Sequence, residues 1–187
     1  MVSGTYGIFN FYETFSMLLQ RGFIDVGFVG GAQVDKFGNI NSTVIGPYEK
    51  PKVRLPGSGG GCEIAGLSRR IVIVTPHEKR RMVDRVDFIT SPGFLSGSDT
   101  RERAGLKGGP SAVITTMGVL RFDETTREMY LASYHPGLSV EQVKQNTGWD
   151  LRVSPDVKET EQPTVKEVEI LRKELDPHGI FLKTAVA

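Results

Sequence analysis

A glycine-rich loop contains the residues of this sequence whose types and spacing are best suited to chemistry. The stretch "VRLPGSGGGCEIAGLSRRIVIVTPH" places Gly57 and Gly59 to Gly61 before an amphipathic segment and then an apolar strand. Glycine has no Cβ, so its backbone N–H groups can come close to a bound oxygen, above all where a helix begins. The loop therefore predicts a site for an anion or a carbonyl oxygen. The alternative is a tight strand-to-helix turn that binds nothing.

The loop does not match the two familiar nucleotide-binding motifs. A Walker loop needs Gly-Lys-Ser/Thr so that an ammonium group reaches the phosphates, but Cys62 and Glu63 follow Gly61. A dinucleotide fingerprint counted from Gly57 needs Gly or Ala where Cys62 stands. It also needs an acidic residue closing the next strand, and "IVIVTPH" has none. What remains is the ability of bare N–H groups to hold an oxygen.

Glu63 and Cys62, next to the glycines, have two interpretations each. Glu63 can approach a ligand bound at the loop, or it stands in the first helical turn because the helix dipole favours a carboxylate there. Cys62 invites comparison with thiol nucleophiles, but no base lies near it in the sequence and free cysteines are often buried, so a structural role is expected. His77 and His135 each follow a predicted strand and can act as acid or base, although "HPG" is also a turn.

A second group of polar side chains surrounds a predicted strand turn. Gln33, Asp35, Asn39 and Asn41 lie on either side of Gly38. Taken alone, they fit the ordinary turn chemistry in which asparagine is common.

Composition and charge restrict the class of protein. The 187 residues are 39% hydrophobic and 24% charged, which suits one globular domain over 1–187. A formal net charge of +1 does not indicate nucleic-acid or membrane-surface binding. A single cysteine, no apolar run of membrane-spanning length and no signal-peptide pattern favour a cytoplasmic protein without a membrane span. The spacing of His, Cys and carboxylates predicts no metal site.

The hydrophobic pattern predicts strands alternating with helices. Four helices are expected, at about 6–20 with Gly22 as the stop, 62–70, 138–150 with Ser139 as N-cap and Gly148 as C-cap, and 165–177. Strands are expected at 24–35, 40–46, 52–55, 71–77, 85–92, 111–123 and 128–137. The strand at 52–55, the glycine loop, the helix and the doubly buried strand at 71–77 form a predicted βαβ unit. Residues 96–110 are expected to be a mobile surface loop, and residues 152–187 a C-terminal tail and helix.

Four motifs in order resemble a known family: "GGAQVDKFGNIN", "KVRLPGSGGGCEIA", "RIVIVTPHE" and "ASYHPGLSVEQVKQNTGWDLRVSP". The sequence is similar to the B (beta) subunit of the family I coenzyme A transferases. The resemblance is strongest to proteins like the glutaconate CoA-transferase beta subunit and weaker to 3-oxoacid CoA-transferases, and it runs from the first helix to about Pro155. It implies an α/β layered fold with an open, mixed, mainly parallel sheet flanked by helices.

The resemblance also implies a reaction and partners. Family members move CoA between an acyl-CoA and a carboxylic acid through a glutamyl-CoA thioester, and backbone N–H groups hold the oxyanions that form. Coenzyme A is then a substrate, with no permanently bound cofactor, and a hetero-oligomer with an A-type CoA-transferase subunit is expected. The substrate-binding residues implied are Gly59, Gly60, Gly61, Glu63, Gln33, Asn39 and Asn41.

One element of the family pattern is missing from this sequence. The nucleophilic glutamate normally lies in a Glu-Ser-Gly or Glu-Asn-Gly motif, and neither tripeptide occurs here. The catalytic residue is therefore unknown, and the chain is expected to correspond to the C-terminal portion of a beta subunit. Two alternatives stay open: a subunit of a hydrolase that opens rings of CoA esters, and a non-catalytic subunit that binds CoA esters. A dicarboxylic substrate would need a cationic partner, for which Arg54, Arg69, Arg101 and Arg103 are all possible and none is assigned.

Overall fold

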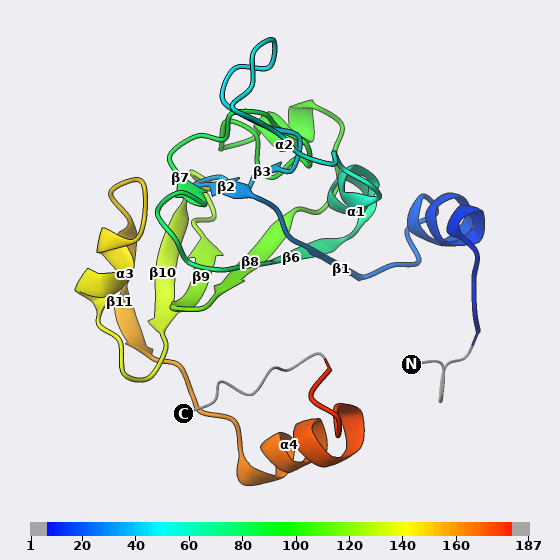
Figure 1. The fold of residues 1–187 in the computed structure, drawn as a ribbon. Helices are drawn as coiled ribbons and strands as arrows, with labels where there is room; N and C mark the ends of the chain where they lie inside the picture. The colour runs from blue at the N-terminus through cyan, green and yellow to red at the C-terminus, as the bar shows by residue number, and fades with distance from the viewer. Residues whose placement is uncertain (1–6, 181–187) are drawn as a thin grey trace.

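A six-stranded mixed sheet forms the centre of the computed structural model, which describes residues 7–180 (Figure 1). The strand order is β1-β6-β8-β9-β10-β11. The β1/β6, β6/β8 and β10/β11 pairs are parallel, and the other two pairs are antiparallel. The strands are β1 (Val26–Val29), β6 (Arg70–Thr75), β8 (Pro110–Thr115), β9 (Gly118–Phe122), β10 (Met129–Tyr134) and β11 (Arg152–Glu159). The predicted α/β fold with a mixed, mainly parallel sheet is confirmed.

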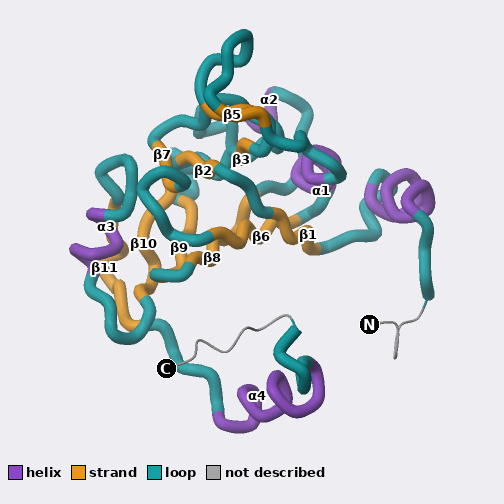
Figure 2. Tube along the Cα trace, in the orientation of Figure 1, coloured by secondary structure: helices purple, strands orange, loops and turns teal. Residues whose placement is uncertain are grey.

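A second layer of short elements covers one side of this sheet (Figure 2). It contains the three-stranded sheet β3-β2-β7 and the two-stranded sheet β4-β5. Its strands are β2 (Gln33–Asp35), β3 (Ile40–Asn41), β4 (Val44–Ile45), β5 (Val53–Arg54) and β7 (Met82–Val83). The helical segments of the chain are η1 (Glu13–Leu19), α1 (Gly61–Leu67), α2 (Thr100–Arg103), α3 (Val140–Gln145), α4 (Val165–Glu169) and η2 (Ile170–Leu175).

The apolar core lies between the sheet and this second layer. Alternate strand residues point to opposite faces, so Ile71 and Ile73 enter the core whereas Val72 and Val74 point away from it. The core cluster consists of Val34, Ile40, Ala65, Ile71, Ile73, Met82, Val113, Leu120, Met129, Leu131, Val143 and Leu151. The sheet therefore buries one face only, and the prediction that 71–77 is buried on both faces is wrong. Val74 is 52% exposed.

The single strand predicted at 24–35 is two strands in two different sheets. Gly30 and Gly31 separate β1 from β2, and a Cβ on Gly31 would lie 2.3 Å from the Ile40 side chain. The glycine pair lets the chain cross between layers where no larger residue fits. β5 pairs with β4, and β6 pairs with β1 and β8, so the predicted βαβ unit does not form from the strand at 52–55.

Two further segments differ from their prediction. Residues 85–92 form no strand beyond a single bridge between Ser91 and Ile40. Conversely, the predicted surface tail contains β11, which pairs in parallel with β10 at the edge of the sheet. Pro155 and the charged residues around it are tolerated because an edge strand needs only one ladder of hydrogen bonds.

The helix ends follow the predicted signals in part. Gly22 has a φ of +77° and its N–H donates to the Leu19 carbonyl, which ends the first helix as expected. Ser139 caps α3 in a capping box with Gln142. The C-cap of α3 is Asn146 and not Gly148.

Arg101 anchors the segment that was expected to be a mobile loop. Its side chain is buried and donates five hydrogen bonds of 2.7–3.1 Å, all to backbone carbonyls. The acceptors are Ala65 in α1, Pro92 and Gly93, and Lys107 and Gly108. Burial lowers the pKa of this guanidinium to about 10, so it stays charged at neutral pH. One cation thus ties three segments together.

Replacing Arg101 with Met is expected to lower the free energy of unfolding by about 4 kcal/mol, because five buried carbonyls lose their donor. The measurement is urea denaturation. Arg103→Met is the matched control in the same helix: its side chain is 70% exposed in a surface ion pair with Asp99 and should cost less than about 1 kcal/mol. Equal losses in the two variants would contradict the anchoring role of Arg101.

Candidate functional site

The glycine loop joins β5 to α1 and is fastened to the end of β3. Gly57 N–H donates to the Ser42 carbonyl at 2.9 Å, and the Ser42 hydroxyl donates back to the Gly57 carbonyl at 2.8 Å. Gly61 N–H donates to the Ser58 carbonyl at 2.8 Å and closes the turn into the helix. Asn41 immediately precedes Ser42, so the predicted glycine and asparagine sites are neighbours along one hydrogen-bonded connection.

Each glycine of the loop is needed for a different reason. Gly57 and Gly59 have φ values of +95° and +51°, in the left-handed region, and a Cβ on either would meet open space. A Cβ on Gly60 would lie 2.2 Å from the Phe15 ring, and one on Gly61 would lie 3.1 Å from Ser91 Oγ. The loop therefore receives the N-terminal helix on one side and leaves its tip at Gly59 open.

The tip of the loop has N–H groups that are free to bind an oxygen. Within residues 7–180, the N–H groups of Gly59 and Gly60 have no hydrogen-bond acceptor, and Gly59 is exposed. Two adjacent free N–H groups at the start of a helix form the kind of arrangement that stabilises an oxyanion. The prediction of a free N–H is wrong for Gly61, whose N–H donates to Ser58, and oxygen binding by Gly59 and Gly60 stays a prediction.

Asn39 holds the loop at 93–95 by using its whole amide. Its Oδ1 accepts from the N–H groups of Gly93 and Leu95 at 2.9 and 3.1 Å. Its Nδ2 donates to the Leu95 carbonyl at 2.7 Å and to Asp35. Asn39 is 1% exposed. Its predicted contact with substrate stays a prediction, and what the structure gives it is a positioning role.

Gln33 and Asn41 form a second buried amide network. Asn41 Nδ2 donates to Gln33 Oε1 at 2.7 Å and to the Val44 carbonyl at 2.6 Å. Gln33 Nε2 donates to Asp87 Oδ2 at 3.0 Å. Both amides are buried and turned towards the protein, so their predicted substrate contacts also stay predictions.

Asp35 borders a cavity of about 240 Å³ beside Asn39. Burial raises the pKa of the Asp35 carboxyl, and hydrogen bonds from Asn39 and Phe37 oppose that rise. Lys36 and Asp84 line the same cavity and form an ion pair, with 2.8 Å between Lys36 Nζ and Asp84 Oδ1, so their two charges offset each other.

Glu63 and Cys62 are both exposed on the first turn of α1. Partial burial, and then the nearby Glu63 charge, raise the pKa of the Cys62 thiol, which keeps it protonated at neutral pH. The burial expected of a free cysteine is wrong here, because Cys62 is exposed, and its structural role stays a prediction. The Glu63 carboxylate lies on the helical turn that follows the free N–H groups, and its contact with substrate stays a prediction.

His77 lies in a buried chain of hydrogen bonds at the end of β6. Its Nδ1 is 3.0 Å from Thr115 Oγ1, and its Nε2 is 2.9 Å from Thr147 Oγ1. Thr115 Oγ1 also donates to the Gly118 carbonyl at 2.8 Å and accepts from the N–H groups of Met117 and Gly118. Thr147 gives its own proton to the Val143 carbonyl at 2.9 Å, so it accepts from Nε2. Burial lowers the pKa of His77 to about 4, so the imidazole is neutral at pH 7.

His135 supports the same turn from the other side. Its Nε2 lies 2.9 Å from the Thr115 carbonyl, which can only accept, so this nitrogen carries a proton. Its backbone N–H donates to the Met117 carbonyl at 2.9 Å. The two histidines, for which the sequence allowed catalytic and structural roles, both hold the β8-β9 turn.

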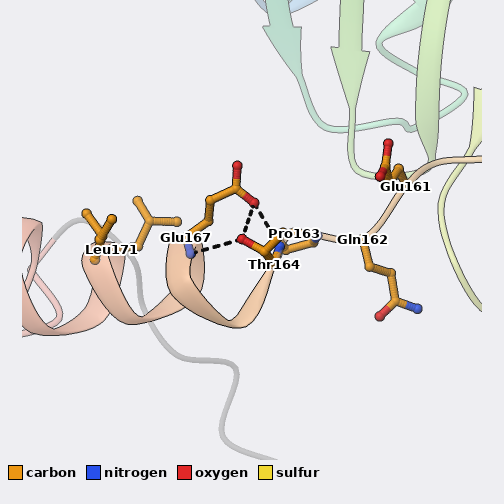
Figure 3. Close-up of a pocket in the computed structure, with 7 residues that line it drawn as sticks. Glu161, Gln162, Pro163, Thr164, Glu167 and Leu171 are labelled. Carbon is orange, nitrogen blue, oxygen red and sulfur yellow. Dashed lines mark hydrogen bonds between the residues drawn. The ribbon is translucent and has the colours of Figure 1, made fainter.

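A cavity of about 660 Å³ lies at the C-terminal segment, far along the chain from the glycine loop (Figure 3). Its lining residues all lie between Glu161 and Leu171. Of the polar side chains drawn there, Thr164 and Glu167 satisfy each other in the α4 capping box, and Glu161 and Gln162 lie on the segment before it. No functional side chain of the predicted site reaches it, so we do not place the site there.

Sequence reasoning missed the residues that support the site. Ser42, Ser91 and Phe15 were not singled out as site residues, because each acts through a partner distant in the sequence. Arg101 was considered only as one of four arginines for a substrate carboxylate, which is wrong because its five donors bind backbone carbonyls. Arg101 has no acidic residue four positions away, but Lys107 in the same stretch has none either, so the sequence does not distinguish the buried cation.

The described His, Cys, Asp and Glu side chains form no metal site. Within residues 7–180, no three His, Cys, Asp or Glu side chains are placed to bind a metal ion. Among the same residues, no helix has the length and apolarity needed to cross a membrane.

Comparison with known proteins finds relatives of this chain. The family described as coenzyme A transferase matches residues 7–146. The chain is 51% identical over 86% of its length to the B subunit of 3-oxoadipate CoA-transferase from Pseudomonas knackmussii, and 48% identical over 84% to the B subunit of glutaconate CoA-transferase from Acidaminococcus fermentans. It spans 62% and 59% of those relatives. The crystal structure of the Acidaminococcus glutaconate CoA-transferase superimposes with a TM-score of 0.80 at 45% identity, covering 85% of this chain and 61% of that one.

Replacing Gly60 with Ala is expected to cost about 2 kcal/mol of unfolding free energy, because the new methyl group displaces the Phe15 ring. The loss should shrink to less than half in a Phe15→Ala background. Gly59→Ala is the matched control: its cost of about 1 kcal/mol comes from backbone strain and should not depend on Phe15. The five variants are Gly60→Ala, Gly59→Ala, Phe15→Ala and the two that combine a glycine substitution with Phe15→Ala, and their free energies of unfolding are measured by thermal or urea denaturation. The packing of Phe15 on Gly60 would be contradicted if Gly60→Ala cost the same free energy of unfolding with and without Phe15.

The neutral state of His77 predicts a specific pH dependence. Between its ordinary pKa of 6.5 and its folded pKa of about 4, the unfolded chain binds a proton that the folded chain does not. The contribution of His77 to the free energy of unfolding is therefore fully present above about pH 6.5. It falls as the pH falls, by about 2 kcal/mol between pH 7 and pH 5, because the unfolded chain takes up a proton. Urea unfolding at both pH values, compared with His77→Gln, isolates this part from the carboxylates. The same pH-dependent loss in the variant would show that His77 is not its source.

Proposed function

Because the chain belongs to the coenzyme A transferase family, we propose that it acts as the B-type subunit of an enzyme that moves CoA between an acyl-CoA and a carboxylic acid. The observation that carries the proposal is the family match over residues 7–146, together with identities of 51% and 48% to two subunits of that type. The names of those relatives point to 3-oxoadipate and glutaconate as acids to test. An A-type subunit is the expected partner, in a cytoplasmic hetero-oligomer.

The proposed role of this chain in the reaction is to hold the reacting oxygen. In a CoA transfer through a glutamyl thioester, each attack on the acyl carbon puts negative charge on a former carbonyl oxygen. The free N–H groups of Gly59 and Gly60 would bind that oxygen, and α1 would add the favourable end of its dipole. Gly61 shapes the entry to the helix, and Glu63 borders the same opening. The attacking glutamate lies outside this chain in this proposal.

The support around the loop explains why its N–H groups can act without moving. Ser42 fixes one end of the loop, and Arg101 holds α1 at the Ala65 carbonyl. Donors that are held in place before the reaction need no reorganisation when charge develops. Gln33, Asn39 and Asn41 contribute to this rigidity, and their contacts with an acyl-CoA are part of the proposal.

The test uses the complex isolated through an affinity tag on this chain. Incubation with an acyl-CoA followed by borohydride reduction should leave a reduced glutamate, detectable by mass spectrometry, on a segment other than residues 1–187. The same sample should transfer CoA to 3-oxoadipate or glutaconate. Release of free CoA with no transfer and no reduced glutamate would favour a CoA-ester hydrolase and overturn the transferase proposal.

A further inference from the structure

A buried hydroxyl group without a partner lies beside the glycine loop. Ser91 is 3% exposed, and in the part of the chain that the structure describes its Oγ forms no hydrogen bond. A hydroxyl that is removed from water is costly unless it finds another partner, so unpaired ones are rare in folded proteins. The nearby hydroxyls of Ser42, Thr43 and Thr90 all form hydrogen bonds. Ser91 therefore has a hydrogen-bonding capacity that the fold does not use.

The Ser91 hydroxyl faces the side of Gly61 on which a larger residue would have its Cβ. Apart from the chain neighbours of Gly61 and the backbone of α1, Ser91 Oγ is the one atom among residues 7–180 within 4 Å of that position, at 3.1 Å. Gly61 is itself partly exposed. The glycine thus leaves room for a ligand atom next to the unpaired hydroxyl.

The backbone holds Ser91 in this position. Its N–H donates to the Ile40 carbonyl and its carbonyl accepts from the Ile40 N–H, both at 3.0 Å. The preceding Thr90 Oγ1 accepts from the Ser42 N–H at 2.9 Å, and Ser42 is in turn bonded to Gly57 in the glycine loop. The loop and the hydroxyl are therefore fixed to the same strand end, and a ligand would meet them as one preorganised group.

We propose that Ser91 is a further ligand-binding residue of the glycine-loop site, where its hydroxyl donates a hydrogen bond to the acyl oxygen of a bound CoA ester. The free N–H groups of Gly59 and Gly60 come directly before Gly61, on the turn that borders the space next to Ser91. Three donors around one oxygen stabilise the negative charge that develops on it. Ser91 keeps its proton throughout, and the acyl carbon forms and breaks the same bonds as in the proposed function, on which this inference rests.

Ser91→Ala removes the hydroxyl, and Ser68→Ala is the matched control. Ser68, at the C-cap of α1, also has a buried Oγ without a partner. Neither substitution breaks a hydrogen bond, so neither should appreciably lower the free energy of unfolding in urea denaturation. In CoA transfer to glutaconate by the complex isolated through this chain, Ser91→Ala should lower kcat about 100-fold with little change in KM. Ser68→Ala should leave both constants unchanged.

Infrared spectroscopy gives a readout that a merely structural role of Ser91 would not change. The probe is a ketone analogue of the glutaconate CoA ester, in which a CH₂ group replaces the sulfur so that it cannot be cleaved, with ¹³C at the ketone carbonyl. Hydrogen bonds lower the stretching frequency of a carbonyl, so the band of the bound analogue should move to higher frequency in Ser91→Ala and stay in place in Ser68→Ala.

Gly61→Ala tests the space itself, independently of the serine. Its methyl group would occupy the position 3.1 Å from Ser91 Oγ. Alanine is also a better helix former than glycine, so the variant should fold. We expect it to weaken binding of the ketone analogue at least tenfold.

Three results would overturn the inference: an unchanged kcat and carbonyl frequency in Ser91→Ala, equal losses in Ser91→Ala and Ser68→Ala, and a complex that does not bind the ketone analogue. The proposed function fails in a different way. If the analogue binds with the expected shift in frequency but the complex transfers no CoA, the transferase proposal is wrong, and the contact of Ser91 with the acyl oxygen stands.

Discussion

The arrangement of the site depends on the hydrogen bonds that the Arg101 guanidinium donates. Its five donors face five backbone carbonyls in three segments, and these bonds involve no acidic side chain. A buried cation in such a position is costly unless every donor is satisfied, so the three segments must keep their relative positions. One of them is α1, which begins at the glycine loop. The position of the loop is therefore set by a polar network, and not only by apolar packing.

The other buried polar groups extend this constraint. Asn39 binds the loop at 93–95, which Arg101 also holds, and Ser42 ties the glycine loop to the end of the strand that contains Asn41. His77 and His135 secure the β8-β9 turn in the same manner. The apolar core lies on one side of the central sheet. The other side has exposed apolar side chains, among them Phe28 and Val74.

The sequence was informative where structure follows from neighbouring residues. The glycine loop and the helix after it, the stop at Gly22 and the cap at Ser139 all depend on local backbone chemistry, and each was predicted. Predictions were wrong where distant partners decide. Residues 96–110 have the composition of a mobile loop, and only the fold shows that Arg101 turns inward there. Val74 lies in a stretch with the composition of a doubly buried strand, but burial of its face requires an element that the described residues do not provide.

Hydrogen exchange of the Arg101→Gln variant, followed by NMR, tests whether Arg101 fixes the glycine-loop helix and the loop at 93–95 as one unit. The N–H groups of Ile64, Gly93 and Leu95 should lose protection together, because their bonds depend on segments that Arg101 joins. Amides in β9 and β10 should stay protected. Unchanged protection at those three amides, or an equal loss across the whole sheet, would contradict the role of Arg101.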